Sequence, residues 1–384
     1  MRAQIFTPTQ DLTDFCIQTR QALHGIPENA REEFKTQAYV MQALSAMPGW
    51  RVAVPCGTAV KAVFEVPQAT SCVAFRADMD ALNITEQTGL PFASQHKGMM
   101  HACGHDGHMA VALGLARAIS QGVIQPRATV VILFQPAEES YGGAQLLVEA
   151  GALENPHVDE VYGLHIHPCE PLGTIGLREG PLMASTTEVV VDFTGTSSHG
   201  ALPHLGRDAL LAAAHFVTLA QEIPSRVVDP MQPALITFGV LSAGTRRNIV
   251  AGHAHVEGII RCFTPQVAEL MIKQITRILQ NISQMYEVTY AMEHPTYYPP
   301  VNNHPQAVAR VRAAAVGFPI NETPMQLTAE DFSYYQTVRP GAFYFVGSGF
   351  EGAAPIHNGY FDFDNRVLAQ GLTVMGNICA GFGE

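Results

Sequence analysis

The chain has 384 residues, of which 47% are hydrophobic and 15% charged, with 22 Lys plus Arg against 34 Asp plus Glu and a formal net charge of −12. This composition is typical of a well-packed globular protein, and the length favours two domains over one. The acidic balance argues against nucleic acid or an anionic membrane surface as a partner.

The sequence also indicates where the protein works. Seven cysteines are scattered without the regular spacing of a disulfide framework, which suits a reducing compartment. The first residues lack the apolar core of a signal peptide, and no run is long and apolar enough to span a membrane. We therefore expect a cytoplasmic protein.

The first half of the chain alternates predicted helices and strands. Two amphipathic helices are expected within residues 11–47, broken at residues 25–27. Apolar, β-branched runs at 59–66, 71–81, 130–134 and 159–168 predict strands, while 109–119 and 142–153 predict helices. This order indicates a sheet with parallel character and helices on its faces.

Side chains that bind metal ions stand where three of these strands are expected to end: Asp78 and Asp80, Glu138 and Glu139, and His165. Open α/β sheets gather their sites at the carboxyl ends of strands. Each group also has an ordinary explanation, as a turn former, a charge at a helix N-terminus or a buried histidine. Three such ends together favour a site.

The densest set of metal-binding groups lies just before the helix predicted at 109–119. Imidazole and thiolate are the ligands that zinc-like ions prefer, and Gly104 and Gly107 let the backbone turn tightly enough to aim several at one point. Of the five candidates, we expect Cys103 and His105 to bind metal and the other three to serve orientation, capping or packing. The set comprises His101, Cys103, His105, Asp106 and His108.

From about residue 184 the pattern changes. The segments 187–196, 208–223, 234–244, 254–263, 269–286 and 287–298 predict strand, helix, strand, strand, helix and strand, the order of a ferredoxin-like unit. A helix at 306–317, a strand at 341–347 and a helix at 368–382 then resume the α/β pattern, and His357 follows that strand. We expect a catalytic domain formed by residues 1–183 and 297–384, interrupted by an inserted α+β domain at 184–296.

Together, these groups predict a centre for two divalent ions, which suits hydrolysis because two ions activate a water molecule and polarise the attacked carbonyl. Glu138 can then act as the general base on the metal-bound water, because neighbouring side chains at a strand end point in different directions. Asp80 is expected to orient a ligand imidazole. The predicted ligands are Cys103, His105, Glu139, His165 and His357.

Several motifs resemble the N-acyl-amino-acid amidohydrolases, which include hippurate hydrolase and the indole-3-acetyl-amino-acid hydrolases, a branch of the dinuclear zinc peptidases of the carboxypeptidase G and aminoacylase type. The resemblance spans nearly the whole chain. It is carried by RADMDAL (76–82), MHACGHDGHMA (100–110), QPAEES with GGA (135–144), GLHIHP (163–168), SSHGALPH (197–204), RRNIVAG (246–252) and IHN (356–358).

The resemblance implies a zinc-peptidase-like catalytic domain with a mixed sheet flanked by helices, and an inserted lid domain that makes a homodimer or higher oligomer. It implies the same five ligands and base, with zinc or manganese first and nickel or cobalt also suitable. His199 resembles a lid histidine that stabilises the oxyanion in a neighbouring subunit, and Asn248 a lid asparagine that contacts substrate. Arg261 matches a position that binds the substrate carboxylate, although a strand-surface charge explains it equally well, and the role of His204 stays open.

The predicted reaction is hydrolysis of an N-acetyl, N-benzoyl or similar N-acyl amino acid to a carboxylic acid and a free amino acid. A dinuclear dipeptidase or carboxypeptidase is the alternative within the same class. A binding protein that keeps the fold without activity is the alternative from another class, and it would be expected to lack a ligand or the base. The acyl group, the amino acid, the native metal and the bridging ligand stay open at this point.

Overall fold

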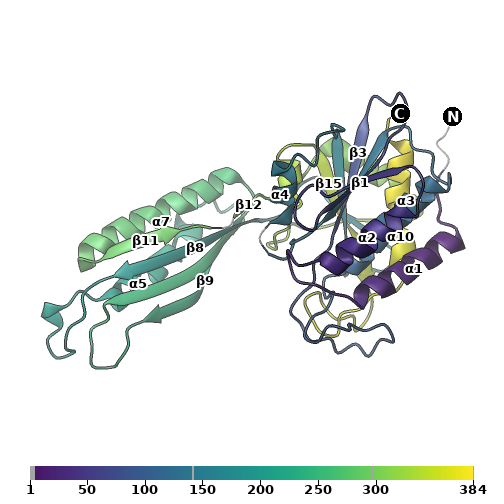
Figure 1. Cartoon of the computed structure of the whole chain (residues 1–384). Coiled ribbons are helices and arrows are strands. Elements are labelled where there is room, and N and C mark those ends of the chain that lie inside the picture. Colours follow the sequence, from purple (N-terminus) through teal and green to yellow (C-terminus); the bar gives the residue numbers. More distant parts are fainter. Residues whose placement is uncertain (1–4, 141, 296, 384) are drawn as a thin grey trace. The chain divides into compact units, whose positions relative to one another are not determined.

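The computed structural model describes residues 5–140, 142–295 and 297–383. Contacts within the chain divide it into two compact units, which are described separately below (Figure 1). Unit 1 comprises Met1–Leu182, Asn302–Pro324 and Asp331–Glu384, and unit 2 comprises Met183–Val301 and Met325–Glu330. In the part of the chain that is described, no helix combines the length and the apolar character needed to cross a membrane.

Unit 1 is built on a mixed sheet of eight strands in the order β1-β2-β4-β3-β5-β15-β6-β14. The four central strands, β4, β3, β5 and β15, are parallel, whereas β2 and β6 run antiparallel to the central strands beside them. The strands are β1 (Trp50–Ala53), β2 (Val60–Phe64), β3 (Cys72–Asp78), β4 (Thr129–Gln135), β5 (Glu160–Pro171), β6 (Ile175–Leu177), β14 (Ile320–Glu322) and β15 (Gly341–Gly349).

Helices cover both faces of this sheet, so the predicted α/β class with a mixed, helix-flanked sheet is confirmed. Helix α3 contacts β3 and β5 and packs beside α1 and α10, while α4 packs on β4 (Figure 1). The approach of α3 to β5 is close, because a Cβ on Gly107 would lie 2.5 Å from Ile166 Cδ1. The helices are α1 (Gln10–His24), α2 (Phe34–Ser45), α3 (His105–Ser120), α4 (Gly143–Glu149), α8 (Pro305–Ala314), α9 (Ser333–Gln336) and α10 (Arg366–Gly381).

Strand β5 is longer than the sequence predicted, and this corrects the placement of His165. The strand continues to Pro171, so His165 lies inside it rather than at its end. Strand β3 pairs with β5 only as far as Gly163, whereas β15 pairs with β5 well beyond that point. The edge of the sheet is therefore stepped, and His165 lies just past the end of the pairing with β3, on the side where β3 stops at Asp78.

Unit 2 has the βαββαβ order of a ferredoxin-like unit. Its sheet has the order β11-β8-β10-β9 with antiparallel neighbours, and β12 also pairs with β8. Helices α5 and α7 contact the same sheet (Figure 1). Alternate residues of β10, such as Val256 and Ile260, are buried in this core. The elements are β8 (Ser185–Thr194), α5 (Ala209–Ala220), α6 (Ile223–Arg226), β9 (Ala234–Ala243), β10 (His253–Cys262), α7 (Pro265–Tyr286), β11 (Thr289–Glu293) and β12 (Tyr297–Tyr298).

Two short strands, β7 (Gly180–Met183) and β13 (Val301–Asn303), pair with each other where the chain passes from one unit to the other and back. A 3-10 turn at Pro203–Leu205 precedes α5. The sequence did not predict β1, β6, β7, β13 or β14, because strands of three or four residues show too little periodicity to recognise.

The separate core of unit 2 gives a stability prediction. Leu279 on α7 is fully buried, so Leu279→Ala should lower the free energy of unfolding by about 2–5 kcal/mol through lost burial and a residual cavity. Met285 on the same helix is 69% exposed, and Met285→Ala should change it by no more than about 0.5 kcal/mol. Urea denaturation followed by circular dichroism measures both, and equal effects of the two variants would contradict this packing.

Candidate metal centre

The stretch before α3 aims two side chains at the stepped edge of the sheet. Gly104 has φ +84°, a conformation open to glycine, and this turn sets Cys103 just before the helix and His105 at its first residue. The main-chain N–H of His357 donates to the carbonyl oxygen of Ala102 at 2.8 Å. That bond brings a residue from the far end of the sequence beside Cys103.

Five side chains from four segments converge here. Cys103 Sγ lies 3.4 Å from His165 Nε2, and His357 Nε2 lies 3.1 Å from Glu139 Oε1. Their donor atoms form two triads that share the thiol: Cys103, His105 and His165 in one, and Cys103, Glu139 and His357 in the other. All the ligands predicted from the sequence are therefore brought together in unit 1.

Main-chain hydrogen bonds fix which nitrogen of each imidazole faces the centre. His105 Nδ1 lies 2.9 Å from the carbonyl oxygen of Asp80, and His165 Nδ1 lies 2.8 Å from that of Ile166. Because a carbonyl oxygen only accepts, both Nδ1 atoms carry the proton and both Nε2 atoms are turned inward. This is the arrangement in which a second partner orients a metal-binding histidine.

His105 Nε2 is buried and has no hydrogen-bond partner among the described residues. The nearest oxygens of Glu138 and Glu139 are each 3.9 Å away, too far for a hydrogen bond. Two atoms that bind one zinc ion at about 2.1 Å with tetrahedral angles stand roughly 3.4 Å apart, so this spacing suits a shared cation better than direct contact.

The charges agree with a cation site. Burial alone would lower the pKa of His105, but the carboxylates of Asp78, Asp80 and Glu139 raise it to about 10. Burial, reinforced by the charges of Glu139 and Glu138, raises the pKa of Cys103 well above its usual value. This buried site thus carries an excess of negative charge, and its thiol, imidazole and carboxylate donors fit zinc-like divalent ions.

A second cluster, formed by Asp78, His105 and His108, does not fit a metal ion, although its atoms lie close together. His108 Nδ1 is 2.7 Å from Asp78 Oδ1, and His108 Nε2 accepts the N–H of Ile166 at 2.9 Å. Both ring nitrogens are therefore taken, and His108 serves orientation. Asp106 likewise binds Arg20 and His24, and His101 is buried.

The turn that begins at Pro136, just after β4, presents the two glutamates. The carboxylate of Asp80 accepts the N–H groups of Glu138 and Glu139, each at 3.0 Å. Asp80 therefore acts on His105 through its main-chain carbonyl and on the glutamates through its side chain. The turn is closed by Gly143, where a Cβ would lie 1.7 Å from the carbonyl oxygen of Pro136. Only glycine fits that position.

The two glutamates differ in their surroundings. Glu139 belongs to the triad with Cys103 and His357, and despite burial the contact with His357 and the charge of His105 hold the pKa of Glu139 below its usual value. Among the described residues of unit 1, Glu138 shares a potential metal triad with His105 and Glu139, and it does not belong to the triads that contain Cys103. This difference supports different roles for adjacent carboxylates.

A buried charge network beneath the centre was missed by sequence reasoning. Arg76 donates to Asp78 at 2.5 Å and to Asp331 at 2.9 Å, and all three side chains are buried. Asp331 also accepts bonds from the side chain of Gln135 and from the N–H of Ala144. The alternation of Asp78 and Asp80 at the end of β3 is a sequence signal for Asp78. No pattern in the sequence indicates that Asp331 contacts Arg76.

The remaining predicted residues lie in unit 2. His199 and Asn248 are exposed and stand on adjacent segments, because the N–H of Gly200 donates to the carbonyl oxygen of Asn248 at 2.8 Å. Arg261 is partly buried on β10, and its Nη1 has no hydrogen-bond partner among the described residues. His204 is exposed in the 3-10 turn.

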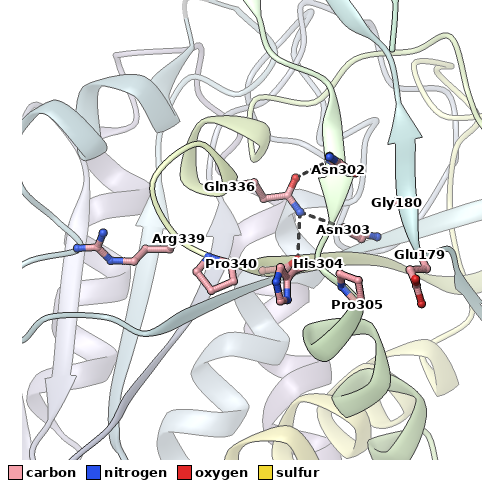
Figure 2. A pocket seen from close by; sticks show the side chains of 10 residues that line it. Glu179, Gly180, Asn302, Asn303, His304, Pro305, Gln336, Arg339 and Pro340 are labelled. Carbon is pink, nitrogen blue, oxygen red and sulfur yellow. Dashed lines mark hydrogen bonds between the residues drawn. The ribbon is translucent and has the colours of Figure 1, made fainter. Parts of the chain in front are cut away.

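A cavity of about 340 Å³ in unit 1 contains none of these residues (Figure 2). Gln336 accepts the N–H of Asn302 and donates to the side chain of Asn303, as the dashed lines in Figure 2 show. None of the potential metal triads among the described residues includes a residue that lines this cavity. It is lined by Glu179, Gly180, Asn302, Asn303, His304, Pro305, Gln336, Arg339, Pro340 and Gly341.

Comparison with known proteins identifies the class. Residues 74–380 match the model of Peptidase family M20/M25/M40. The chain is 38% identical over 370 residues to the N-acetyldiaminopimelate deacetylase of Lacticaseibacillus casei (strain BL23), covering 94% of this chain and 95% of the relative. It is also 38% identical over 371 residues to the protein of the same name from Lactococcus lactis subsp. cremoris (strain SK11), covering 94% and 96%.

Two solved structures support the same family assignment. The YXEP protein of Bacillus subtilis, described as a dinuclear metal binding peptidase from the M20 family, has a TM-score of 0.85 and 29% identity, covering 97% of this chain and 98% of that one. A structure from methicillin-resistant Staphylococcus aureus has a TM-score of 0.92 and 30% identity, covering 98% of both chains. The chain therefore belongs to Peptidase family M20/M25/M40, as the resemblance predicted. It is an amidohydrolase that acts on linear amides.

The charge network beneath the centre gives a stability prediction. Asp331→Ala should lower the free energy of unfolding by roughly 3–5 kcal/mol, because it breaks one of the buried ion pairs of Arg76 and leaves the buried donors of Gln135 and Ala144 without this acceptor. The matched control is Glu65→Ala, which removes an exposed partner of Arg51 and should cost about 0–1 kcal/mol. Denaturant titration of both variants is the measurement, and an equally small loss in Asp331→Ala would show that the buried network contributes nothing.

Proposed function

We propose that the protein hydrolyses the amide bond of N-acyl amino acids, giving a carboxylic acid and a free amino acid, with two divalent metal ions per subunit. The observation that carries this proposal is the pair of adjacent carboxylates in unequal surroundings beside a Cys/His donor set. The ligands are Cys103, His105, Glu139, His165 and His357. Zinc or manganese is the first candidate, and nickel or cobalt also suits these donors.

Divalent ions bound at such a centre lower the pKa of a water molecule and polarise an amide carbonyl. Glu138 supplies the proton transfers. Its carboxylate takes a proton from the attacking water and returns it to the amide nitrogen as that group leaves, so no proton is gained or lost overall. The burial of Glu138, at 8% exposure, limits the bulk water that competes for this proton.

Cys103 is the proposed bridging ligand. It is the member common to the two triads, and no other residue belongs to both. Asp80 is proposed to orient this machinery twice: its carbonyl oxygen sets the tautomer of His105, and its carboxylate holds the amides that precede the two glutamate side chains. The Asp80 carboxylate also lies close to this imidazole, with Oδ1 3.5 Å from His105 Nδ1.

The substrate assignment draws on the relatives and on unit 2. The relatives are named for deacetylating N-acetyldiaminopimelate, so we place an acetyl group first among the acyl groups. Arg261 is proposed to bind the substrate carboxylate, a task suited to a guanidinium with a buried, unpartnered Nη1. His199 is proposed to stabilise the oxyanion and Asn248 to contact substrate, with unit 2 acting as a lid and as the contact in a homodimer or higher oligomer.

Metal removal and a substrate panel test the proposal. Protein stripped with a chelator should lose hydrolysis of N-acetyl amino acids, and zinc, manganese, cobalt or nickel should restore it. Amino acid release is measured with N-acetyldiaminopimelate, other N-acetyl, N-benzoyl and indole-acetyl amino acids, and dipeptides. Full activity after stripping would refute the metal centre, and preference for dipeptides would favour a peptidase instead.

The two glutamates can be separated by matched substitutions. Glu138→Gln should keep two metal ions per subunit and lose most turnover, because the base is removed while the ligands stay. Glu139→Gln should lower the metal content, because an amide is a poorer ligand than a carboxylate. Metal analysis and kcat are measured on the same preparations. Metal loss in Glu138→Gln with retention in Glu139→Gln would reverse the assignment.

A further inference from the structure

We propose that Glu33 is a positioning residue for Glu138, acting through the main chain of Ala137. This inference rests on the proposed role of Glu138 as the base. Glu33 lies more than a hundred residues earlier in the chain, just before α2, and it does not belong to the potential metal triads formed by the described residues. Its task is to hold the start of the turn that presents the two glutamates.

Both carboxylate oxygens of Glu33 accept hydrogen bonds. Oε1 accepts the N–H of Ala137 at 2.9 Å and the N–H of Arg31 at 2.9 Å. The hydroxyl of Thr58 donates to Oε2. The side chain is fully buried, so water does not compete for these bonds. A carboxylate held in this way fixes the direction of the Ala137 N–H.

Ala137 has the backbone conformation in this turn that its surroundings must hold in place. Its φ is +56°, a left-handed conformation that a residue with a Cβ avoids unless its surroundings impose it. The carbonyl oxygen of Ala137 accepts the N–H of Gly143 at 3.1 Å, so the turn is closed on that side. On the other side, the bond to Glu33 resists the return of Ala137 to an ordinary φ, which would swing Glu138 away.

Three consecutive amides are therefore held by two buried carboxylates. Glu33 takes the amide of Ala137, and Asp80 takes those of Glu138 and Glu139. Because Asp80 holds both glutamates alike, it cannot by itself set the first residue of the turn. Glu33 supplies that missing constraint. Its loss should disturb Glu138, which directly follows Ala137, more than the ligand Glu139, which His357 also contacts.

The same segment offers a matched control. Glu28 is also buried, at 9% exposure, and its Oε2 accepts the N–H groups of Lys35 and Thr36 and the hydroxyl of Thr36. These bonds stabilise the first turn of α2, and none of them involves Ala137. Glu28→Ala should therefore loosen the amino-terminal segment without moving the turn that begins at Pro136.

The experiment compares Glu33→Ala, Glu33→Gln and Glu28→Ala in the full-length protein loaded with metal. Glu33→Ala should lower kcat roughly 10- to 100-fold, because a displaced base costs rate even when it stays chemically intact, while KM and metal content hold. Glu33→Gln keeps an oxygen acceptor for Ala137 and should recover most of kcat. Glu28→Ala should lower the melting temperature and keep kcat.

A second readout does not depend on activity. In Glu33→Ala, hydrogen–deuterium exchange of the peptide containing residues 137–139 should become faster, and in Glu28→Ala it should stay as in the wild type. If Glu33→Ala does not fold, Thr58→Val decides, because it removes one donor to Glu33 without touching the turn. Thr58→Val should lose less kcat than is expected for Glu33→Ala, and exchange of the peptide containing residues 137–139 should again become faster than in the wild type.

Unchanged exchange at 137–139 in both Glu33→Ala and Thr58→Val would overturn the inference, whatever the activity. An unchanged kcat in Glu33→Ala would also overturn it. The same holds if the loss of kcat is explained by lost metal, or if Glu28→Ala loses as much kcat as Glu33→Ala. Wild-type protein that hydrolyses no N-acyl amino acid would instead overturn the proposed function. The exchange measurement would still decide whether Glu33 holds the turn.

Discussion

The structure of unit 1 depends on keeping a concentration of negative charge buried at one edge of its sheet. Asp78 ends β3, Asp80 follows it, and Glu138 and Glu139 follow β4. Charges removed from water are tolerated only when they are paired or hydrogen-bonded, and three of these acids are stabilised in different ways. Arg76 neutralises Asp78, main-chain amides satisfy Asp80, and Glu139 faces imidazoles.

Most of the geometry of the centre is set by the main chain. Carbonyl oxygens orient His105 and His165, and the N–H of His357 ties that residue to the cluster before α3. The donor atoms are therefore placed by the shape of turns and by the stepped end of β3 against β5. A substitution that leaves a side chain intact but changes one of these turns can disturb the chemistry as much as loss of a ligand.

The sequence predicted those parts of the site that have a local pattern. Apolar runs marked β3 and β4, so the acids that follow them could be assigned to one edge, and the spacing around Cys103 marked a donor set. The position of His165 could not be read in this way, because it depends on how far β3 pairs with β5. Glu33 and Asp331 escaped for the same reason. Glu33 contacts Ala137, and Asp331 contacts Arg76, each across a long stretch of chain.

The division of the chain also separates two kinds of task. The donor atoms and the proposed base all lie in unit 1, where buried bonds restrict them, whereas Arg261 belongs to the sheet of unit 2. On β10 the neighbours Ile260 and Cys262 are fully buried in the core formed with α5 and α7, so alternation turns Arg261 to the other face. Residues on that half-buried face lie outside the core formed with α5 and α7, so they can change without disturbing it. If Arg261 binds the substrate carboxylate as proposed, substrate preference can vary through unit 2 while the buried charges of unit 1 keep the metal ligands and the base in place.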